Sequence, residues 1–352
     1  MKVAPVLRSL RSRGSEQLLV HTGQHYDANM STVFFDELDL PRPDVDLEVG
    51  SGSHAWQTGE VMKRLEPVLL EHKPGLLMVY GDINSTMAAA LTACKLQVLV
   101  AHVEAGLRSF DRTMPEETNR IVTDHVSDLL LTHCSDANQN LAREGIDPSK
   151  VHLVGNVMID SLVRLLPKAR TRGILHDLNL MDGNQSILPF VLVTLHRPSN
   201  VDCPERLLEI VHALNELAKT CPIVFPVHPR TRERIAQSGI DSSRGHIQIT
   251  QPLGYLDFLC LENRARAVVT DSGGVQEETT YLGVSCFTLR PNTERPVTIT
   301  CGTNKLVSGN LDGLASLVRE SVQAPPRVPK PPAYWDGRAA ERISEVVLQL
   351  HG

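Results

Sequence analysis

Residues 268–279, VVTDSGGVQEET, combine an apolar run with two consecutive glycines and a pair of acids. Ser272, Gly273 and Gly274 follow a predicted strand and lead into a predicted helix, so the backbone there can approach a ligand closely. Free amide groups at the start of a helix attract anions, and the ligand that suits this turn is a phosphate or a diphosphate. Glu277 and Glu278, one turn into the helix, could accept hydrogen bonds from ribose hydroxyls.

This turn is neither the G-x-G-x-x-G fingerprint nor a Walker loop, so neither a dinucleotide nor ATP is favoured. From these residues alone, a tight turn flanked by surface acids stays equally open. Basic residues also follow predicted strands: His196 and Arg197, then His228 and Arg230, and later Arg295. A histidine and an arginine at a strand end could help to hold a diphosphate, although solvated loop side chains fit the pattern equally well.

Three acidic residues follow predicted strands or open predicted helices in the first half of the chain. They are Asp82 in GDINST, Glu104 in HVEAGLRS and Glu116 in PEETNR. Taken singly, Asp82 and Glu116 could cap helices, and Glu104 could pair with Arg108. Three acids that converge on one site could instead divide the roles of acid and base, because different environments separate their pKa values. Basic groups in one half and acids in the other are typical of a nucleotide-sugar site.

Apolar runs alternate with amphipathic stretches along the whole chain, which predicts a series of βαβ units. The expected strands are 18–21, 76–80, 98–102, 129–132 and 151–154, and then 190–195, 223–227, 247–250, 267–270 and 285–289. The expected helices are 55–71, 86–95, 116–126, 137–144 and 157–166, and then 204–219, 232–237, 255–263, 275–282, 312–322 and 338–350.

The fold class is therefore α/β, with two doubly wound Rossmann-like domains that face a cleft. Residues 1–175 would form a first domain, completed by the helix 338–352, and residues 176–330 would form a nucleotide-binding second domain. The opening residues MKVAPVLRSLRSRG read as a helix that precedes the first strand. This is the second half of a βα unit.

The composition of the chain limits the kinds of partner and the kind of environment that are expected for it. The 352 residues carry a net charge of −6 and no long basic run, which argues against nucleic acid or an anionic membrane surface. No run of 18 apolar residues is present, so no membrane span is expected. The seven cysteines are scattered without a C-x-x-C pair, which indicates reduced thiols in a cytoplasmic protein and no zinc site.

Together these strings resemble the non-hydrolysing UDP-N-acetylglucosamine 2-epimerases, a family of two-domain proteins with the GT-B fold. The matching elements run in family order over nearly the whole chain: KVAP, TGQH, GDINST, HVEAGLRS, PEETNR, VTLHRP, PVHPRT, PLGYLDF, TDSGGVQEE and TERP. The resemblance implies interconversion of UDP-GlcNAc and UDP-ManNAc through elimination and re-addition of UDP, with a 2-acetamidoglucal between them. It implies no NAD, since no hydride moves, and no metal, since protein cations neutralise the leaving group.

The resemblance also implies roles for individual residues. It assigns Asp82, Glu104, Glu116 and His196 to catalysis, without saying which carboxylate is base and which is acid. It assigns Lys2, Phe258, Ser272, Gly273, Gly274, Glu278 and Arg295 to substrate binding, with Phe258 beside the uracil and Glu278 at the ribose. Gln24, His25 and His228 are candidates for regulation by the substrate, and a homodimer is expected.

Three departures from the family accompany this resemblance. Members begin with a strand and a glycine loop that resembles FGTRPEAIK, and Met1 stands near the end of that loop. We therefore expect a first domain without its first strand, which leaves the two neighbouring strands with unpaired edges. The residues after His25 differ from the QHREML of bacterial relatives, and Leu253 replaces a glutamine found in some members.

Alternative functions follow from the same residues. A GT-B glycosyltransferase shares the fold and the nucleotide cradle, but the three carboxylates would be superfluous in it. A catalytically impaired UDP-sugar-binding protein would result from the absent strand and loop. A hydrolysing relative would release free ManNAc and UDP.

Overall fold

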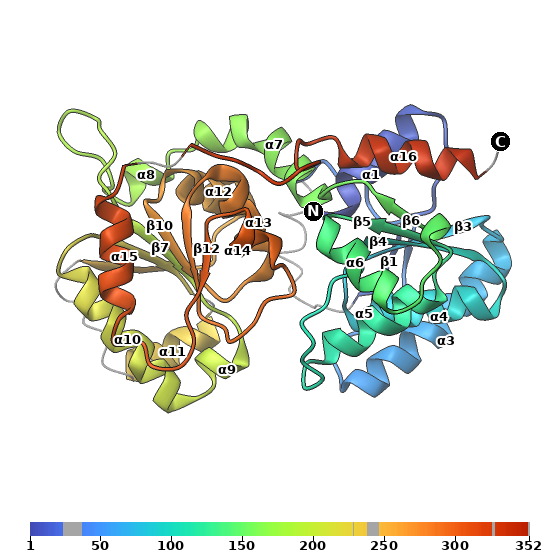
Figure 1. Cartoon of the computed structure of the whole chain (residues 1–352), viewed down its shortest axis with the longest axis horizontal. Coiled ribbons are helices and arrows are strands. Elements are labelled where there is room, and N and C mark those ends of the chain that lie inside the picture. Colours follow the sequence, from blue (N-terminus) through green and yellow to red (C-terminus); the bar gives the residue numbers. More distant parts are fainter. Residues whose placement is uncertain (24–36, 228, 238–245, 326–327, 351–352) are drawn as a thin grey trace. The chain divides into compact units, whose positions relative to one another are not determined.

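The computed structural model describes residues 1–23, 37–227, 229–237, 246–325 and 328–350. The chain divides into two compact units, Met1–Ser161 with Ala333–Gly352, and Leu162–Pro332 (Figure 1). The division lies inside helix α7, Val157–Arg170, whereas the sequence analysis placed the domain boundary between residues 175 and 176. Each unit is an α/β layer structure with parallel strands, so the predicted fold class is confirmed.

The first unit contains two parallel sheets. The larger has the strand order β3-β4-β5-β6, and the smaller pairs β1 with β2. The strands are β1 Val20–His21, β2 Val45–Asp46, β3 Leu76–Tyr80, β4 Leu99–Ala105, β5 Leu129–Thr132 and β6 Val151–Leu153. The helices are α1 Val3–Ser12, α3 His54–His72, α4 Asn84–Lys95, α5 Pro115–Val126, α6 Ser135–Arg143, α7 and α16 Ala339–Gln349.

Helices cover both faces of the first unit's larger sheet. Successive side chains of a strand point to opposite faces, so neighbouring residues of β4 enter different cores. Val100 packs with α3 and α4, whereas Ala101 and Val103 pack with α1 and α16. This double cover explains why these strands read as continuous apolar runs rather than as an alternating pattern.

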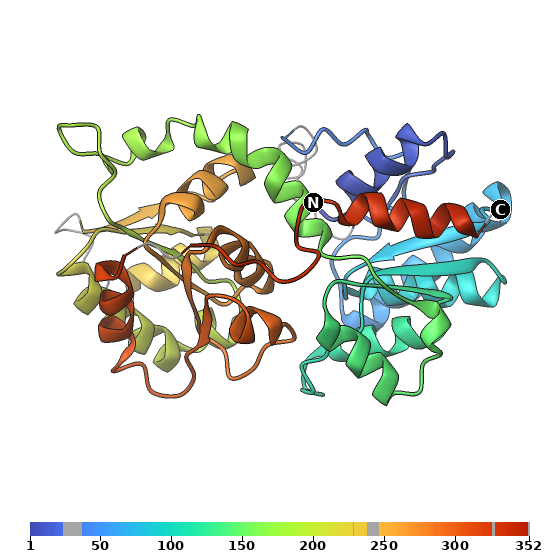
Figure 2. The same cartoon turned by 45° about the horizontal axis from the view of Figure 1, so that its top comes forward.

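The end of the chain returns to the first unit. Trp335 is buried there and donates its indole N–H to the carbonyl of His133 at 2.9 Å. In α16, Ser344 donates to the hydroxyl of Ser9 in α1 at 2.7 Å, and the two helices lie side by side in both views (Figure 2). The helix predicted at 338–350 therefore forms, and it packs on α1 over one face of the sheet.

The second unit contains one six-stranded parallel sheet with the order β12-β11-β10-β7-β8-β9. The strands are β7 Val191–Thr194, β8 Ile223–Pro226, β9 Ile247–Thr250, β10 Ala267–Thr270, β11 Ser285–Thr288 and β12 Asn304–Leu306. The helices are α8 Ile174–Asp177, α9 Pro198–Val201, α10 Pro204–Ala218, α11 Pro229–Gln237, α12 Tyr255–Arg264, α13 Gly273–Leu282, α14 Val297–Thr300 and α15 Leu314–Gln323.

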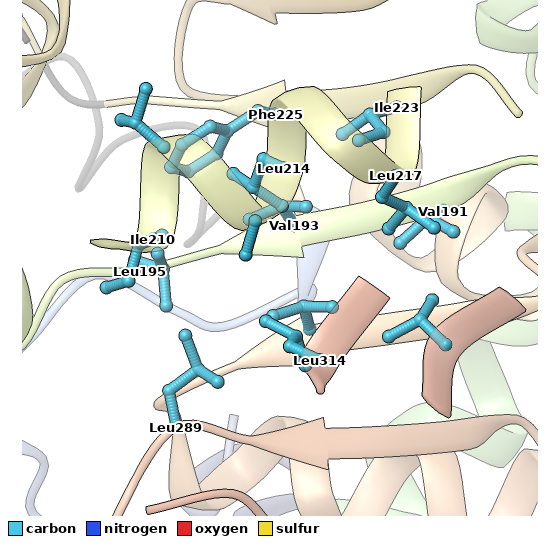
Figure 3. Packing of buried hydrophobic residues seen from close by; sticks show 14 of the residues in the cluster. Val191, Val193, Leu195, Ile210, Leu214, Leu217, Ile223, Phe225, Leu289 and Leu314 are labelled. Carbon is cyan, nitrogen blue, oxygen red and sulfur yellow. The ribbon is translucent and has the colours of Figure 1, made fainter. Parts of the chain in front are cut away.

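One core of the second unit lies between its sheet and α10 (Figure 3). Val191 and Val193 of β7 point into it together with Leu214 and Leu217 of α10, and Phe225 of β8 lies in the same cluster. Residues two apart on a strand share a face, so β7 contributes alternate side chains to this core. The core holds β7 and β10 next to each other, and the loops after these two strands carry the site residues described below.

Candidate active site

Asp82 lies in the turn that follows β3. Gly81 precedes it with a φ of +70°, and its amide donates to the carbonyl of Val103 in β4 at 3.1 Å. The Asp82 carboxylate accepts a hydrogen bond from Nε of Arg120 at 2.9 Å and is a quarter exposed. Helix α4 takes Ile83 as its N-cap residue, so Asp82 does not cap that helix. Arg120 thus holds one side of the carboxylate, and the other side is open to solvent.

Glu104 sits at an irregularity of β4. The pairing of β4 with β5 shifts register between Val103 and Ala105, and Glu104 has a φ of +74°. A non-glycine residue in this region costs on the order of 1–3 kcal/mol and persists only where the surrounding structure imposes it. Bulges of this kind re-aim a side chain and are common next to active sites. The bulge thus directs a buried carboxylate at the carboxyl end of the sheet.

Lys2 joins these two turns. Its ammonium group forms an ion pair with the Glu104 carboxylate. A Cβ placed on Gly81 would lie 2.8 Å from Nζ of Lys2 and 3.8 Å from Oε2 of Glu104. A side chain at position 81 would therefore displace the lysine, and the positive φ disfavours one independently. Lys2, Glu104 and the turn that carries Asp82 are thus in direct contact.

Helix α5 supplies the third carboxylate. Pro115 occupies its first turn, and Glu116 and Glu117 lie at its positively polarised end. Glu117 is buried and accepts the amides of Ser109 and Phe110 at 2.9 and 2.8 Å, so it fixes the preceding loop. Glu116 is half-buried and is spaced four residues from Arg120, the residue that binds Asp82. This spacing puts Glu116 on the same helix face as Arg120.

A buried network of hydrogen bonds and ion pairs, which the sequence analysis did not predict, holds the ends of β3 and β4 in place. His102 contacts Asp124 through Nδ1 at 2.6 Å and the carbonyl of Gly81 through Nε2 at 2.8 Å. Asp124 also accepts the Gly106 amide at 3.1 Å and Nη1 of Arg108 at 2.7 Å. Both ring nitrogens of His102 thus lie within hydrogen-bond distance of an oxygen atom. The network ties β3, β4 and α5 together directly behind Glu104.

Asp124 remains ionised in this buried place. Burial pushes its pKa upward, but the charges and hydrogen bonds of His102 and Arg108 outweigh burial and leave the pKa below its ordinary value. Arg108 pairs with Asp124 and with Glu144, whereas Glu104 pairs with Lys2. The alternative pairing of Glu104 with Arg108 is therefore wrong. HVEAGLRS contained both His102 and Arg108, but their partner lies sixteen or more residues away in α5.

In the second unit, the turn between β10 and α13 lies against Arg295. The Ser272 amide donates to the side chain of Thr270 at 3.0 Å, and Gly273 begins the helix. A Cβ on Gly273 would lie 2.5 Å from Nη1 of Arg295, so the close approach of the guanidinium requires a glycine. Gly274 follows as the second helical residue and is half-buried. The structure thus brings a helix start and a cation to one place.

Two carboxylates hold that cation. Arg295 is buried and donates Nε to Glu277 at 2.8 Å, and its Nη1 pairs with Glu294. Glu277, which the sequence analysis considered together with Glu278 as an acceptor for ribose hydroxyls, therefore positions the arginine. Arginine suits this task because its fork of donors can serve carboxylates and a phosphate at the same time.

His196 follows β7 and contacts Asp271. Its Nδ1 lies 3.0 Å from the Asp271 carboxylate, while most of its ring is exposed. Asp271 is fully buried and also accepts the amide of Arg197 at 3.0 Å and the side-chain amide of Asn200 at 3.0 Å. Burial raises the pKa of Asp271, but its contacts with His196, Asn200 and the Arg197 amide outweigh burial and bring the pKa below the ordinary value. An ionised Asp271 orients His196 and keeps its other ring nitrogen available.

Glu278 lies in a buried acidic pair. Tyr255 donates its hydroxyl to the Glu278 carboxylate at 2.6 Å, and Glu262 lies beside them. Burial raises the pKa of Glu278 to about 7, and burial together with Glu278 raises that of Glu262 well above its ordinary value. Tyr255 and Phe258 both belong to α12, and Phe258 is half-buried. One proton shared within the acidic pair leaves Glu278 able to accept hydrogen bonds.

Three candidate residues, Gln24, His25 and His228, lie outside the described residues. Over the described ranges, no group of three or more His, Cys, Asp or Glu side chains is arranged to hold a metal ion. No helix in this part of the chain has the length and apolar character to cross a membrane. All seven cysteines are free thiols, and Cys134, Cys221, Cys260 and Cys286 are buried.

The two parallel α/β units and their strand-end sites define the class of GT-B proteins. The profile of the UDP-N-acetylglucosamine 2-epimerase family matches residues 8–348. The chain belongs to this family.

Individual relatives agree with the family profile. The UDP-N-acetylglucosamine 2-epimerase of Methanocaldococcus jannaschii is 42% identical over 99% of this chain and 95% of its own length. The crystal structure of that archaeal protein in complex with UDP-GlcNAc and UDP matches with a TM-score of 0.89, over 100% of this chain and 96% of the solved one. The UDP-2,3-diacetamido-2,3-dideoxy-D-glucuronate 2-epimerase of Pseudomonas aeruginosa is 43% identical over 95% of this chain and 92% of its own length.

Proposed function

We propose that this protein epimerises UDP-GlcNAc to UDP-ManNAc at C2, reversibly, by eliminating and re-adding UDP. The observation that carries the proposal is the Glu104 bulge, which aims a strained, buried carboxylate at Lys2 beside the Asp82 turn. Removal of a weakly acidic C–H proton needs a base held in a fixed place, and protonation from the other face needs an acid. The first unit supplies candidates for both.

The two candidates differ in environment. Glu104 is buried and paired with a lysine, whereas Asp82 is a quarter exposed and paired with an arginine. We infer that Asp82, Glu104 and Glu116 divide the proton transfers, and that Lys2 orients Glu104.

The leaving group is a diphosphate, and we assign it to the second unit. The amides at the start of α13 and the nearby Arg295 guanidinium would offset the charge that develops as the C1–O bond breaks. His196, held by Asp271, would donate to the same leaving group. Glu278 would accept the ribose hydroxyls, with Phe258 packing beside the uracil. The protein would thus need neither NAD nor a metal for this reaction.

Product analysis with UDP-GlcNAc alone tests the proposal. Conversion to UDP-ManNAc without an acceptor supports it, since a glycosyltransferase would leave the substrate unchanged. Release of free ManNAc and UDP would indicate a hydrolysing enzyme. Binding of UDP-GlcNAc without any product would indicate a binding protein, and either of these results would overturn the proposal.

A second substrate has a specific observation in its favour. The relative from Pseudomonas aeruginosa is 43% identical and is named for a diacetamido glucuronate nucleotide. The same assay with UDP-2,3-diacetamido-2,3-dideoxy-D-glucuronate would decide between the two. A kcat/KM at least ten times higher for that compound would make it the substrate and UDP-GlcNAc an analogue.

We also propose that the enzyme works in the cytoplasm and as a homodimer. Free thiols at all seven cysteines fit a reducing compartment. The dimer rests on the family resemblance, and light scattering after size exclusion would test it. A mass of one chain, 38.8 kDa, at micromolar concentration would contradict it.

A further inference from the structure

Glu262 is a fully buried acidic residue near the end of α12. Tyr255 lies seven residues before it and Phe258 four residues before it, so the three side chains share one face of the helix. Helix α13 packs against α12 and brings Glu278 into contact with Tyr255 on this face. Glu262 is therefore a neighbour of the two residues that are assigned to the nucleoside, Glu278 and Phe258.

The carboxyl group of Glu262 has no cationic or neutral donor beside it. Among the residues that the structure describes, none donates a hydrogen bond to either of its oxygens. The group that acts on it is the Glu278 carboxyl, which lies within hydrogen-bonding reach. Two ionised carboxylates contain only acceptors, so a buried pair of them can form a hydrogen bond only when one carries a proton. The pair therefore holds a proton.

The Tyr255 hydroxyl determines which member of the pair is ionised. It donates to Oε1 of Glu278 at 2.6 Å, and a bond of this kind stabilises the charged form of its acceptor. Glu262 lacks such a donor in the described part of the chain, so its charged form would be buried without compensation. The proton consequently belongs on Glu262. Burial raises the pKa of Glu278, and the hydrogen bonds from Tyr255 and from Glu262 both lower it.

Other titratable groups near the pair leave this assignment unchanged. Glu277, next to Glu278 in α13, is paired with Arg295. Cys286 of β11 keeps its proton, because burial raises the pKa of the thiol to about 12. A carboxylate that is paired with a cation and a thiol that does not ionise cannot take the place of Glu262 as the carrier of the proton.

We propose that Glu262 is a positioning residue of the nucleoside site, a neutral carboxylic acid that donates a hydrogen bond to Glu278 and so keeps Glu278 ionised and fixed for ribose hydroxyls. This inference rests on the proposed function, which assigns the ribose to Glu278. With bonds from Tyr255 and Glu262, Glu278 retains further lone pairs for the ligand. Ribose hydroxyls that donate to them complete the hydrogen bonds around a buried charge.

Binding of the nucleoside is then linked to the release of a proton. Below about pH 7, Glu278 becomes protonated in the free protein. A protonated carboxyl group has lost part of its acceptor capacity, so ribose hydroxyls bind the ionised form more tightly and the proton leaves on binding. The affinity for the nucleotide should therefore fall as pH falls below this value, by at most about tenfold per pH unit for one proton.

The test measures nucleotide binding by Glu262→Gln and Glu262→Met beside the parent chain. Glutamine keeps a neutral donor at this position, whereas methionine is of similar length and has none. Glu216→Gln is the control, because Glu216 pairs with Lys219 on the exposed side of α10.

Equilibrium dialysis from pH 5.5 to 8.5 uses UDP-GlcNAc labelled in the uracil ring, so that bound nucleotide is counted whichever epimer is present. UDP-GlcNAc has no terminal phosphate, a group that would itself titrate near pH 6. Because binding is measured rather than turnover, a failure to epimerise would overturn the proposed reaction and leave this inference intact. A parent chain that does not bind UDP-GlcNAc at any pH would overturn both.

Glu262→Gln and the control should bind within about threefold of the parent chain and show the same pH profile. Glu262→Met should bind about tenfold or more weakly at pH 7, and its affinity should begin to fall at a higher pH, because Glu278 has then lost one of its two donors. Affinity of Glu262→Met equal to that of the parent would overturn the inference. If Glu262→Met does not fold, Glu262→Gln decides, and a profile displaced by one pH unit or more contradicts the inference.

The 2′-deoxyribose analogue of UDP-GlcNAc separates positioning from general damage to the site. The parent chain should prefer the ribose compound by about tenfold or more, since a missing hydroxyl leaves a buried acceptor unpaired. Glu262→Met should lose most of this preference, while Glu262→Gln should keep it. An equal preference in the parent and in Glu262→Met would show that Glu262 does not act through Glu278.

Discussion

At the residue scale, the account depends on how single carboxylates are held. Glu104 is aimed by a bulge and paired with Lys2, while Asp82 is paired with Arg120. Each carboxylate has a different cationic partner and a different exposed fraction, and both belong to the unit to which the diphosphate is not assigned. Their effects on turnover and on nucleotide binding should therefore be separable.

Glu104→Gln and Asp82→Asn should each lower turnover by about 10²-fold or more, because each removes one proton-transfer group and keeps its shape. UDP affinity, measured by calorimetry, should stay within about threefold of the parent, since the diphosphate is assigned to the second unit. Glu60→Gln is a matched control, because Glu60 pairs with Arg64 on the surface of α3. Turnover of either active-site variant close to that of the control would refute the assignment.

Asp124→Asn should cost stability rather than substrate affinity. Removal of this buried charge leaves His102 and Arg108 without the Asp124 carboxylate as a partner. Breaking a buried ion pair costs about 3–5 kcal/mol. The free energy of unfolding in urea should fall by that amount. Glu144→Gln touches the same arginine from a partly exposed position and should cost about 1 kcal/mol or less. Similar losses in the two variants would show that the network does not act as described.

Glu278 gives the stability a pH dependence. Its pKa is raised by burial from an ordinary 4.5 to about 7 in the folded protein. The folded state therefore binds more protons than the unfolded state between these values, and the free energy of unfolding falls as pH rises through this window. Glu278→Gln should remove this part of the pH dependence. Superimposable profiles of parent and variant from pH 4.5 to 7 would rule out the raised pKa.

At the element scale, the backbone of the turn between β10 and α13 determines how closely the Arg295 guanidinium can approach the start of the helix. Gly273 permits Arg295 to approach the helix start, and Glu277 and Glu294 hold the guanidinium there. The position of the Arg295 charge thus depends on the absence of a side chain at residue 273. A change in the backbone residue should act through the arginine.

Gly273→Ala should weaken UDP binding by about tenfold or more, because the added methyl group would lie 2.5 Å from Nη1 of Arg295. Gly313→Ala is the control, since a Cβ at Gly313 meets nothing within 4 Å. Calorimetry with UDP measures both variants. Unchanged affinity for Gly273→Ala would show that the position of Arg295 at this turn does not matter for the diphosphate.

At the scale of the whole molecule, the sequence predicted the layers well and their connections less well. The long apolar runs of both units form strands of parallel sheets. Such strands are buried on both faces, and a continuous apolar run is the pattern that this position requires. The two-residue strands β1 and β2 and the short β12 have too few residues for a pattern, and β2 and β12 were not predicted. α9 and α14, of four residues each, were missed for the same reason.

Site residues could be predicted where a polar or glycine residue lies at the end of a predicted strand. Asp82, Glu104 and the glycine turn of α13 were found in this way. Arg120 and the His102–Asp124 pair were not, because their partners lie on other elements and only the folded chain shows them. Buried networks of this kind join segments that no local pattern connects.

The central claim is that protein carboxylates exchange the proton at C2 while UDP leaves and returns. Proton NMR of UDP-GlcNAc in D₂O with the enzyme tests this claim most directly. The account predicts UDP-ManNAc with deuterium at C2, and deuterium at C2 in the recovered UDP-GlcNAc as well. Epimers that form with the original proton retained at C2 would contradict it.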